Sequence, residues 1–420
     1  MSTISVALIG AGQRGAAYAE YALKYPEEVS FVAVADIDTV RKERFKKEHR
    51  IGDELAFDSW EQLLARPKVA DAVIICLQDQ MHFEPAIKAL EKGYHVLLEK
   101  PMSPNPAECV VMGEYAEKYH RVFSICHVLR YTPFYQKLKQ LLTDGAIGRL
   151  VSITHIENVE HRHQAHSFVR GNWRNSESSS PMILSKSCHD MDILLWLADA
   201  DCTKVSSFGS LTHFKKENAP EGAPRYCLDG CPVKDECPYF APRMYLERDD
   251  WVGAVLRSIV SNDPSDEGVL RALKDGPYGR CVYHCDNNVV DHQVVNLEFA
   301  NEVTVAFTMT AFTLEGGRSM KLMGTRGQIR ADMEKNVIEV TNFSARGTET
   351  IHLDVAAEGH GGGDFGIMRD FIRSVRCGEA DSGLTGARIS VQSHLMAFAA
   401  EKSRLESRVV LMTDYMKELR

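Results

Sequence analysis

The sequence contains no apolar run that approaches the roughly 20 residues needed to cross a bilayer, and its first apolar stretch runs straight into glycines at Gly10 and Gly12. A secretory signal peptide would need a basic start and a longer apolar core. Long Lys/Arg runs are also missing, and the net charge of −9 disfavours a surface that tracks nucleic-acid phosphates. We therefore expect a cytoplasmic protein with neither a membrane nor a nucleic acid as partner.

A chain of 420 residues is too long for one ordinary core, so we expect two domains, residues 1–127 and 128–420. In the first domain, short apolar runs alternate with helical patterns. This alternation predicts an α/β fold, a doubly wound parallel sheet with helices on both faces. The expected strands are 4–9, 31–35, 72–76, 95–98 and 122–125, and the expected helices are 15–24, 39–49, 82–91 and 106–119.

The second domain has a different pattern, because strands follow one another there with turns rather than helices between them. We expect strands at 150–159, 205–211, 289–299, 302–312, 319–323, 328–331 and 336–340. They predict an α+β domain with a large, mainly antiparallel open sheet. An insertion at about 215–285, rich in Pro, Gly, Cys and charge, interrupts this sheet.

The segment Gly10-Ala-Gly12-Gln13-Arg14-Gly15 follows the first strand and opens the first helix. Glycines there permit a tight turn and close approach of the backbone to a pyrophosphate, and the helix N-terminus favours the phosphate charge. Asp36 ends the second strand, where a carboxylate can accept hydrogen bonds from ribose hydroxyls and would repel a 2′-phosphate. NAD is therefore the expected cofactor, and Arg41 nearby keeps NADP open as the less favoured one.

The fifth strand ends in Glu99-Lys100-Pro101, at the sheet edge where open α/β folds bind ligands. Together with the glycine motif, this tripeptide resembles the Gfo/Idh/MocA family of glucose-fructose oxidoreductase, inositol dehydrogenase and related enzymes. Three further pieces carry the resemblance: the 82–96 segment His-x3-Ala-Ile-x-Ala-Leu-x2-Gly-x-His-Val, Arg130-x2-Pro133 and Gly145-Ala-Ile-Gly148.

The resemblance implies that Lys100 hydrogen-bonds the reacting hydroxyl and that Glu99 orients it. Oxidising an alcohol requires a proton to leave oxygen while hydride leaves carbon, and a lysine shielded from water can accept that proton. The cofactor contacts expected on this basis are Gly10, Gly12, Gln13, Arg14, Gly15, Asp36, His82, Glu99 and Lys100.

A second catalytic segment is expected as a helix around Lys186-Ser-Cys-His189. It resembles the family segment in which an aspartate and a histidine four residues later face the substrate, and His189 matches that histidine. The aspartate is replaced by Ser185, which weakens the expected proton relay. Lys186 is instead a candidate for neutralising negative charge on the substrate.

Several polar and aromatic side chains upstream suit a sugar ring. His163, Arg170 and Trp173 are candidate substrate contacts, and a solvated loop is the alternative interpretation of this stretch. His127 and Arg130 are further candidates near the domain junction. His360 is a weak candidate in a glycine-rich segment, where Asp364 is the expected N-cap of a helix at 365–375.

Five of the 11 cysteines crowd between Cys227 and Cys285. In a reducing compartment such a cluster more often holds a metal than forms disulfides. The expected ligands are Cys227, Cys231, Cys237 and Cys285, with Cys281 as the alternative fourth. A structural zinc is the simplest occupant, while an iron–sulfur cluster or unpaired thiols remain open.

The sequence thus predicts an NAD-dependent oxidoreductase acting on a sugar, polyol or sugar derivative. One alternative is a glycosidase or lyase that uses NAD transiently through a keto-sugar. The other is a non-catalytic NAD-binding regulator, against which the intact Glu99-Lys100-Pro101 and His189 argue. By resemblance only, we expect a homodimer or homotetramer formed through the C-terminal sheet.

Overall fold

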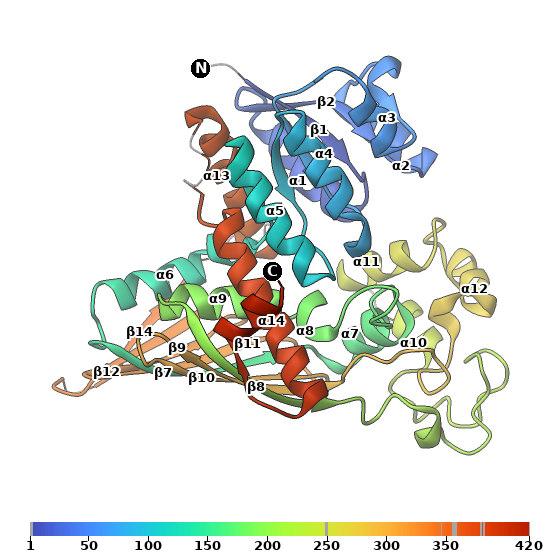
Figure 1. Ribbon diagram of the computed structural model, residues 1–420. Helices are drawn as coiled ribbons and strands as arrows, with labels where there is room; N and C mark the ends of the chain where they lie inside the picture. The colour runs from blue at the N-terminus through green and yellow to red at the C-terminus, as the bar shows by residue number, and fades with distance from the viewer. Residues whose placement is uncertain are drawn as a thin grey trace.

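The structure is a computed structural model that describes residues 3–247, 251–345, 347–354, 359–378, 380 and 383–419. Two sheets dominate it, one in the N-terminal third of the chain and one in the remainder (Figure 1). Within these ranges, no helix is both long and apolar enough to span a membrane.

The N-terminal sheet has six strands, all parallel, in the order β3-β2-β1-β4-β5-β6. This confirms the predicted doubly wound parallel sheet. The strands are β1 (Ile4–Ile9), β2 (Val29–Ala35), β3 (Ala56–Phe57), β4 (Ala72–Ile75), β5 (His95–Leu98) and β6 (Phe123–Ile125). The helices between them are α1 (Gln13–Lys24), α2 (Thr39–His49), α3 (Trp60–Ala65), α4 (Phe83–Glu91) and α5 (Pro106–Tyr119).

The near-continuous apolar character of these strands has a direct cause in the packing. Ala7 and Ile9 of β1 belong to one buried cluster, whereas Val6 and Leu8 belong to a second cluster. Alternate side chains of a strand point to opposite faces, so both faces of this sheet are covered.

The second sheet has nine strands in the order β14-β13-β12-β11-β7-β10-β9-β8-β15. Every neighbouring pair is antiparallel except β7 and β10, which confirms the predicted mainly antiparallel sheet. Its strands are β7 (Leu150–Asn158), β8 (Cys202–Ser210), β9 (His292–Phe299), β10 (Thr304–Thr310), β11 (Gly317–Gly324), β12 (Gly327–Asp332), β13 (Val337–Asn342), β14 (Glu349–His352) and β15 (Val410–Leu411).

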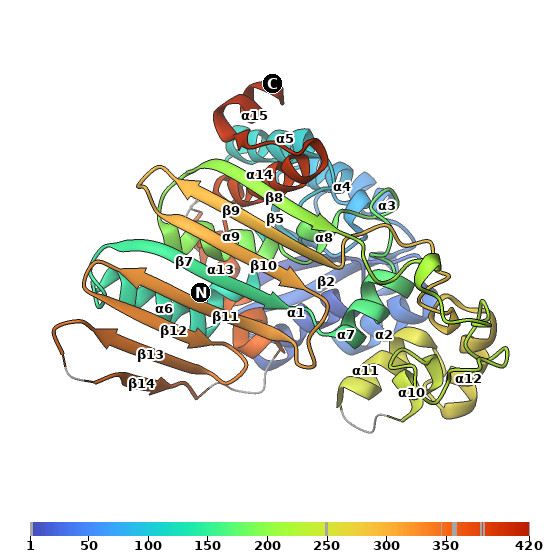
Figure 2. The same cartoon turned by 90° about the horizontal axis from the view of Figure 1, so that it is seen from below.

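Helices cover one face of the second sheet and leave the other face open (Figures 1 and 2). The covering helices are α6 (Pro133–Thr143), α9 (Cys188–Ala198) and α14 (Ala387–Glu406), and the short helices α7 (His161–His163) and α8 (Met182–Ser185) lie toward the insertion. A π-helical turn, Gln164–Arg170, follows α7 directly. The chain ends in α15 (Met412–Glu418).

The insertion between β8 and β9 lies at one end of the second sheet (Figure 2). It contains α10 (Ala241–Leu246), α11 (Trp251–Val260) and α12 (Asp266–Asp275). A separate buried cluster holds it together, including Phe214, Tyr245, Leu273 and Val282. The insertion therefore packs around a small core that it shares with Ala165, Val169 and Ala311.

Late segments of the chain return to the N-terminal sheet. Helix α13 (Gly363–Cys377) contributes Phe371 and Ile372 to the same buried cluster as Val6 and Leu8. The N-cap of α13 is Gly362, so the prediction of Asp364 as N-cap is wrong. Asp364 lies in the first turn, where it pairs with Arg14 instead.

Candidate functional site

The glycine loop between β1 and α1 has the geometry that a dinucleotide requires. Gly10 has φ +92°, and a Cβ there would lie 2.4 Å from the carbonyl oxygen of Cys76. A Cβ on Gly15 would lie 2.3 Å from the carbonyl oxygen of Gly10. At Gly12, the N-cap of α1, a Cβ would meet nothing nearer than an Arg41 nitrogen at 3.9 Å. Gly10 and Gly15 thus shape the turn, and Gly12 leaves open the approach to the helix N-terminus.

Asp36 is buried at the end of β2, beside this loop. Its carboxylate accepts hydrogen bonds from the backbone N–H of Ala11 (2.7 Å) and of Asp38 (2.8 Å). Arg41 Nη2 lies 3.5 Å from Asp36 Oδ1, and the Arg41 side chain is 44% exposed. Two backbone donors leave lone pairs on this carboxylate for ribose hydroxyls. These residues fit the adenosine half of a nicotinamide dinucleotide.

Glu99 lies buried at the end of β5 and is held from three sides. Oε1 accepts from Arg14 Nε (2.7 Å) and from the Tyr18 hydroxyl (2.8 Å), and Oε2 accepts from the backbone N–H of Lys100 (2.6 Å). Burial opposes ionisation of Glu99, but Arg14 and Lys100 keep its pKa below the usual value. Glu99 is therefore a fixed carboxylate that orients the backbone of the Glu99-Lys100-Pro101 tripeptide.

Arg14 links three parts of the chain at this position. Besides Glu99 it binds Asp364 of α13, with 2.7 Å between Nη2 and Oδ1. This contact joins residues 350 positions apart. Helix α13 is thereby tied to the cofactor end of the Rossmann sheet.

Lys100 is half-buried, and its Nζ donates a hydrogen bond to the backbone carbonyl of Ser185 (3.0 Å). Ser185 ends α8, just before the segment that carries Lys186 and His189. Lys100 Nζ therefore lies between the C-terminal edge of the parallel sheet and the second predicted catalytic segment. Ser185 contacts Lys100 through its backbone carbonyl, and the Ser185 hydroxyl donates instead to the carbonyl of Pro181.

His189 lies in the first turn of α9 with 8% of its surface exposed. Its ring centroid is 6.0 Å from that of His127, which is 5.3 Å from that of His394. Burial, and then the charges of Arg130 and Lys100, lower the pKa of His127 well below its ordinary value. The His127 imidazole is therefore neutral at physiological pH.

Lys186 begins a chain of alternating charges that runs under the site. Its Nζ lies 3.2 Å from Glu157 Oε1 on β7. Arg318 Nε, on β11, lies 2.8 Å from both Glu157 Oε2 and Asp190 Oδ1. His155 Nε2 completes the chain at 2.7 Å from Asp190. Lys186 is thus one end of a paired network rather than an isolated cation.

Two of the three candidate substrate contacts, His163 and Trp173, lie beside the same ring, that of Phe168, and the third does not. His163 is the last residue of α7, and its side chain is exposed. Trp173 is half-buried and packs near Phe168, with 6.1 Å between ring centroids. Arg170, the last residue of the π-helical turn, is fully buried against the insertion and donates to the carbonyls of Arg280 and Tyr239, at 2.7 Å each. This burial argues against Arg170 as a substrate contact.

Two other candidates have structural partners. His82 Nδ1 lies 2.7 Å from the carbonyl of Pro101 and Nε2 lies 3.1 Å from that of Leu77, so its ring ties two loops together. Arg130 forms a buried bidentate pair with Asp192, both distances being 2.7 Å. The side chain of His360 lies outside what the structure describes.

The cysteine cluster is not assembled as the metal site that was expected. All 11 cysteines are free, and no group of three His, Cys, Asp or Glu side chains that could hold a metal occurs among the described residues. Cys227, Cys231 and Cys237 share one small cavity with Cys281. The Cys285 thiol is not part of that lining and lies 3.3 Å from the carbonyl of Cys281.

Several residues of the site carry no signal that local sequence patterns could detect. Tyr18, Asp190, Arg318, His394 and Asp364 gain their roles only because the fold brings distant segments together. The Arg318–Asp190 contact, for example, joins residues 128 positions apart. The charged residues Glu157 on β7 and Arg318 on β11 cannot be recognised as partners until the two strands are known to pair.

Known proteins match the chain over most of its length. Residues 4–127 match an oxidoreductase family with an NAD-binding Rossmann fold, and residues 135–330 match the GFO/IDH/MocA C-terminal domain. YteT of Bacillus subtilis (strain 168) is 23% identical over 336 residues, which cover 76% of each chain. Myo-inositol 2-dehydrogenase of Thermotoga maritima is 27% identical over 210 residues, 49% of this chain and 58% of that enzyme.

Solved structures agree in fold. Levoglucosan dehydrogenase, in a complex with NADH and L-sorbose, superposes with a TM-score of 0.72 at 19% identity, covering 98% of this chain and 99% of that one. The two domain matches, the glycine loop with Asp36 and the Glu99-Lys100-Pro101 edge all lead to one conclusion: this chain is an NAD(P)-dependent oxidoreductase of the GFO/IDH/MocA family.

Proposed function

We propose that this protein is an NAD-dependent dehydrogenase that oxidises a secondary hydroxyl of a sugar, cyclitol or sugar derivative. The observation that carries the proposal is the position of Lys100. Its amine lies at the C-terminal edge of the cofactor sheet and is held against the carbonyl of Ser185. A hydroxyl placed there lies between the cofactor domain and the segment that bears Lys186 and His189.

In this reaction the substrate C–H bond breaks and its electron pair goes to the nicotinamide, which is the chemistry that bound NAD supplies. The O–H proton goes to the neutral amine of Lys100, and the carbonyl product forms. Glu99, fixed by Arg14 and Tyr18, holds the Lys100 backbone and places a negative charge beside the new ammonium. His189 is the proposed partner that exchanges this proton with solvent.

The proposed substrate is uncharged and rich in hydroxyls. Lys186 is paired with Glu157, and the two cations Lys186 and Arg318 balance the two anions Glu157 and Asp190. A site with compensated charges suits hydroxyl groups better than a phosphate, because a phosphate needs surplus positive charge. The similar proteins support a substrate of this class, since a myo-inositol dehydrogenase and a levoglucosan dehydrogenase are among them.

NAD is proposed over NADP because Asp36 is buried at the ribose position and faces the loop. A 2′-phosphate would bring a second negative charge next to this carboxylate. Arg41 is the one described cation beside it, and that side chain already lies 3.6 Å from Asp38.

A redox-neutral cleavage of glycosides is the second candidate. Ser185 supplies only its carbonyl to Lys100, so position 185 contributes no carboxylate to a proton relay. Transient oxidation that makes a neighbouring C–H acidic would still use Lys100 and His189.

The test is to incubate the purified protein with NAD and a panel of sugars, cyclitols and aryl glycosides, following NADH absorbance and aglycone release. NADH formed with a free sugar or cyclitol supports the dehydrogenase. Aglycone release without NADH would establish the glycosidase in its place. Tight NAD binding with neither signal across the panel would contradict both and leave a non-catalytic regulator.

We further propose a homo-oligomer that forms through the open face of the nine-stranded sheet. Phe208 (67% exposed) and Val294 (37% exposed) lie opposite each other on β8 and β9 of this sheet.

A cytoplasmic location is proposed because all 11 cysteines are free thiols, which persist in a reducing compartment.

A further inference from the structure

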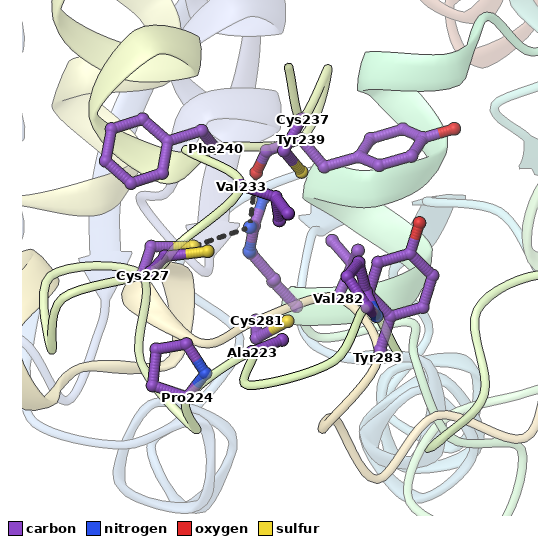
Figure 3. Close-up of a pocket in the computed structure, with 13 residues that line it drawn as sticks. Ala223, Pro224, Cys227, Val233, Cys237, Tyr239, Phe240, Cys281, Val282 and Tyr283 are labelled. Atoms are coloured by element: carbon purple, nitrogen blue, oxygen red, sulfur yellow. Dashed lines mark hydrogen bonds between the residues drawn. The ribbon is translucent and has the colours of Figure 1, made fainter. Parts of the chain in front are cut away.

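A cavity of about 10 Å³ lies in the insertion, and four thiols line it. They belong to Cys227, Cys231, Cys237 and Cys281. Figure 3 shows the labelled cysteines 227, 237 and 281 approaching the cavity from different sides. No part of the catalytic arrangement around Lys100 uses these residues.

Backbone hydrogen bonds hold the segments that carry Cys227 and Cys281 together. The Cys227 N–H donates to the carbonyl of Gly279 and the Cys281 N–H to that of Arg225, at 2.9 Å each. Tyr226 and Arg280 form an antiparallel bridge between these two bonds. Two segments about 54 positions apart are thereby locked together directly at the cavity.

The other two thiols are held by tight turns of one short segment. The Cys237 N–H donates to the carbonyl of Val233 (2.9 Å), and the carbonyl of Cys231 accepts from the Lys234 N–H (3.4 Å). The spacing Cys227-x3-Cys231 lies within the range that is typical of structural zinc sites, and Cys281 supplies a further thiol from a distant segment.

The charge of Arg170 calls for negative partners at this cavity. Its guanidinium is fully buried, yet no carboxylate oxygen of the described residues is paired with it. It donates to two backbone carbonyls, and its Nη2 lies 3.7 Å from Cys227 Sγ. Burying an uncompensated cation costs several kcal/mol. Thiolates are the anions that the surrounding side chains can supply.

We propose that Cys227, Cys231, Cys237 and Cys281 bind one Zn²⁺ ion as thiolates, with Arg170 as the outer hydrogen-bond donor to Cys227. Four thiolates around Zn²⁺ carry a net charge of −2, which Arg170 partly compensates. No group of three such ligands is assembled among the described side chains, so binding of the ion has to draw the four sulfur atoms together.

The size of the cavity favours a single ion. About 10 Å³ holds roughly one water-sized sphere, which suits one metal ion and not a cluster of several iron and sulfide atoms. Since all four ligands are protein thiolates, the site has no open position for substrate and is structural. The zinc site would brace the segment Gln164–Arg170 through Arg170, and this segment begins directly after His163.

Elemental analysis of the full-length protein, purified without chelator, tests this proposal. We expect one zinc per chain and no visible absorption. Cys231→Ser and Cys281→Ser should each lose at least half of the zinc, whereas the matched control Cys285→Ser, from the same insertion, should keep it. Zinc lost from Cys285→Ser and kept by Cys281→Ser would overturn the ligand assignment, and iron with visible absorption would overturn zinc as occupant.

A second measurement does not depend on the folding of variants. Wild-type protein exchanged with Co²⁺ should show the intense ligand-to-metal bands of tetrathiolate cobalt at one Co²⁺ per chain. Wild-type protein that has not been exchanged should release its zinc only when a mercurial reagent titrates four thiols. Metal-free wild-type protein in which these thiols react freely, and whose melting temperature does not change with added zinc, would overturn the proposal.

Discussion

The two walls of the candidate site are built in different ways. The cofactor wall uses the backbone of residues 10–15 and one carboxylate, Asp36, all within one β-α-β unit. The opposite wall uses Lys186, Glu157, Asp190 and Arg318, which come from β7, β11 and the segment around α9. The first wall depends on local conformation, and the second depends on the pairing of distant strands. Substitutions should therefore change binding on one wall and stability on the other.

The largest effect is expected at Lys100, where the two walls meet. Lys100→Ala removes the proposed base, so kcat should fall by about 10²–10⁴-fold. NAD affinity should stay within about threefold of wild type, because the glycine loop and Asp36 are untouched. Steady-state NADH formation and NAD titration measure the two quantities. Lys417→Ala, whose side chain is 79% exposed, is the matched control and should leave both unchanged.

Asp190→Asn tests the second wall. Asp190 is fully buried between His155 and Arg318, and these partners lower its pKa against the opposing effect of burial. Removing its charge leaves Arg318 partly uncompensated, so the free energy of unfolding should fall by about 3–5 kcal/mol. Urea denaturation measures it, with Asp414→Asn (58% exposed) as control and an expected change below about 0.5 kcal/mol. A loss no larger than that of the control would mean that this network does not support the fold.

Asp36→Asn tests the first wall with nearly unchanged shape. The side-chain oxygen can still accept from Ala11, but the charge on the ribose side is lost. NAD affinity should fall by about 10–100-fold, which corresponds to about 1.5–3 kcal/mol for hydrogen bonds to a charged group. The ratio of NADP to NAD affinity should rise. An unchanged preference for NAD would place the ribose elsewhere.

The smallest effect is a pH dependence of stability that arises at His394. Its Nδ1 lies 2.7 Å from the carbonyl of Ser390 and its Nε2 accepts from the Met102 N–H (2.9 Å), which fits the neutral ring only. Burial lowers its pKa to about 3 from 6.5. The unfolded chain therefore binds the proton first, and stability falls by at most about 1.4 kcal/mol per pH unit as pH drops below 6.5.

Urea midpoints at neutral and mildly acidic pH measure this dependence. His394→Gln should reduce the slope, whatever its effect on stability at neutral pH. An equal slope in the variant and the wild type would assign the pH dependence to other buried histidines, such as His166, whose pKa burial lowers to about 4.

The sequence was sufficient for features that depend on local conformation. The glycine loop, the acid at Asp36 and all but one strand of the parallel sheet were predicted, because apolar strands covered on both faces have a pattern that is easy to recognise. The missed strand, β3, has only two residues, too few to show any periodicity. The same holds for β15 at the edge of the second sheet.

Features that depend on tertiary contacts could not be predicted. Arg170 was expected to bind substrate because of its type and neighbours, yet it is buried and lines the cysteine cavity. Cys281 and Cys285 are four residues apart in a sequence without regular periodicity, so their spacing could not show which thiol faces the cavity. Arg14 and Asp364 pair only because α13 returns to the Rossmann sheet.

The central claim is that Lys100 accepts a proton and does not serve merely as a positive charge. Lys100→Arg tests it most directly, because arginine keeps the charge and a donor for the Ser185 carbonyl but cannot be deprotonated in proteins. With the best substrate of the panel, we expect NAD to bind as in wild type and NADH formation to be lost at every pH measured. Turnover by Lys100→Arg within about tenfold of wild type would contradict the account, since this is less than a general base contributes.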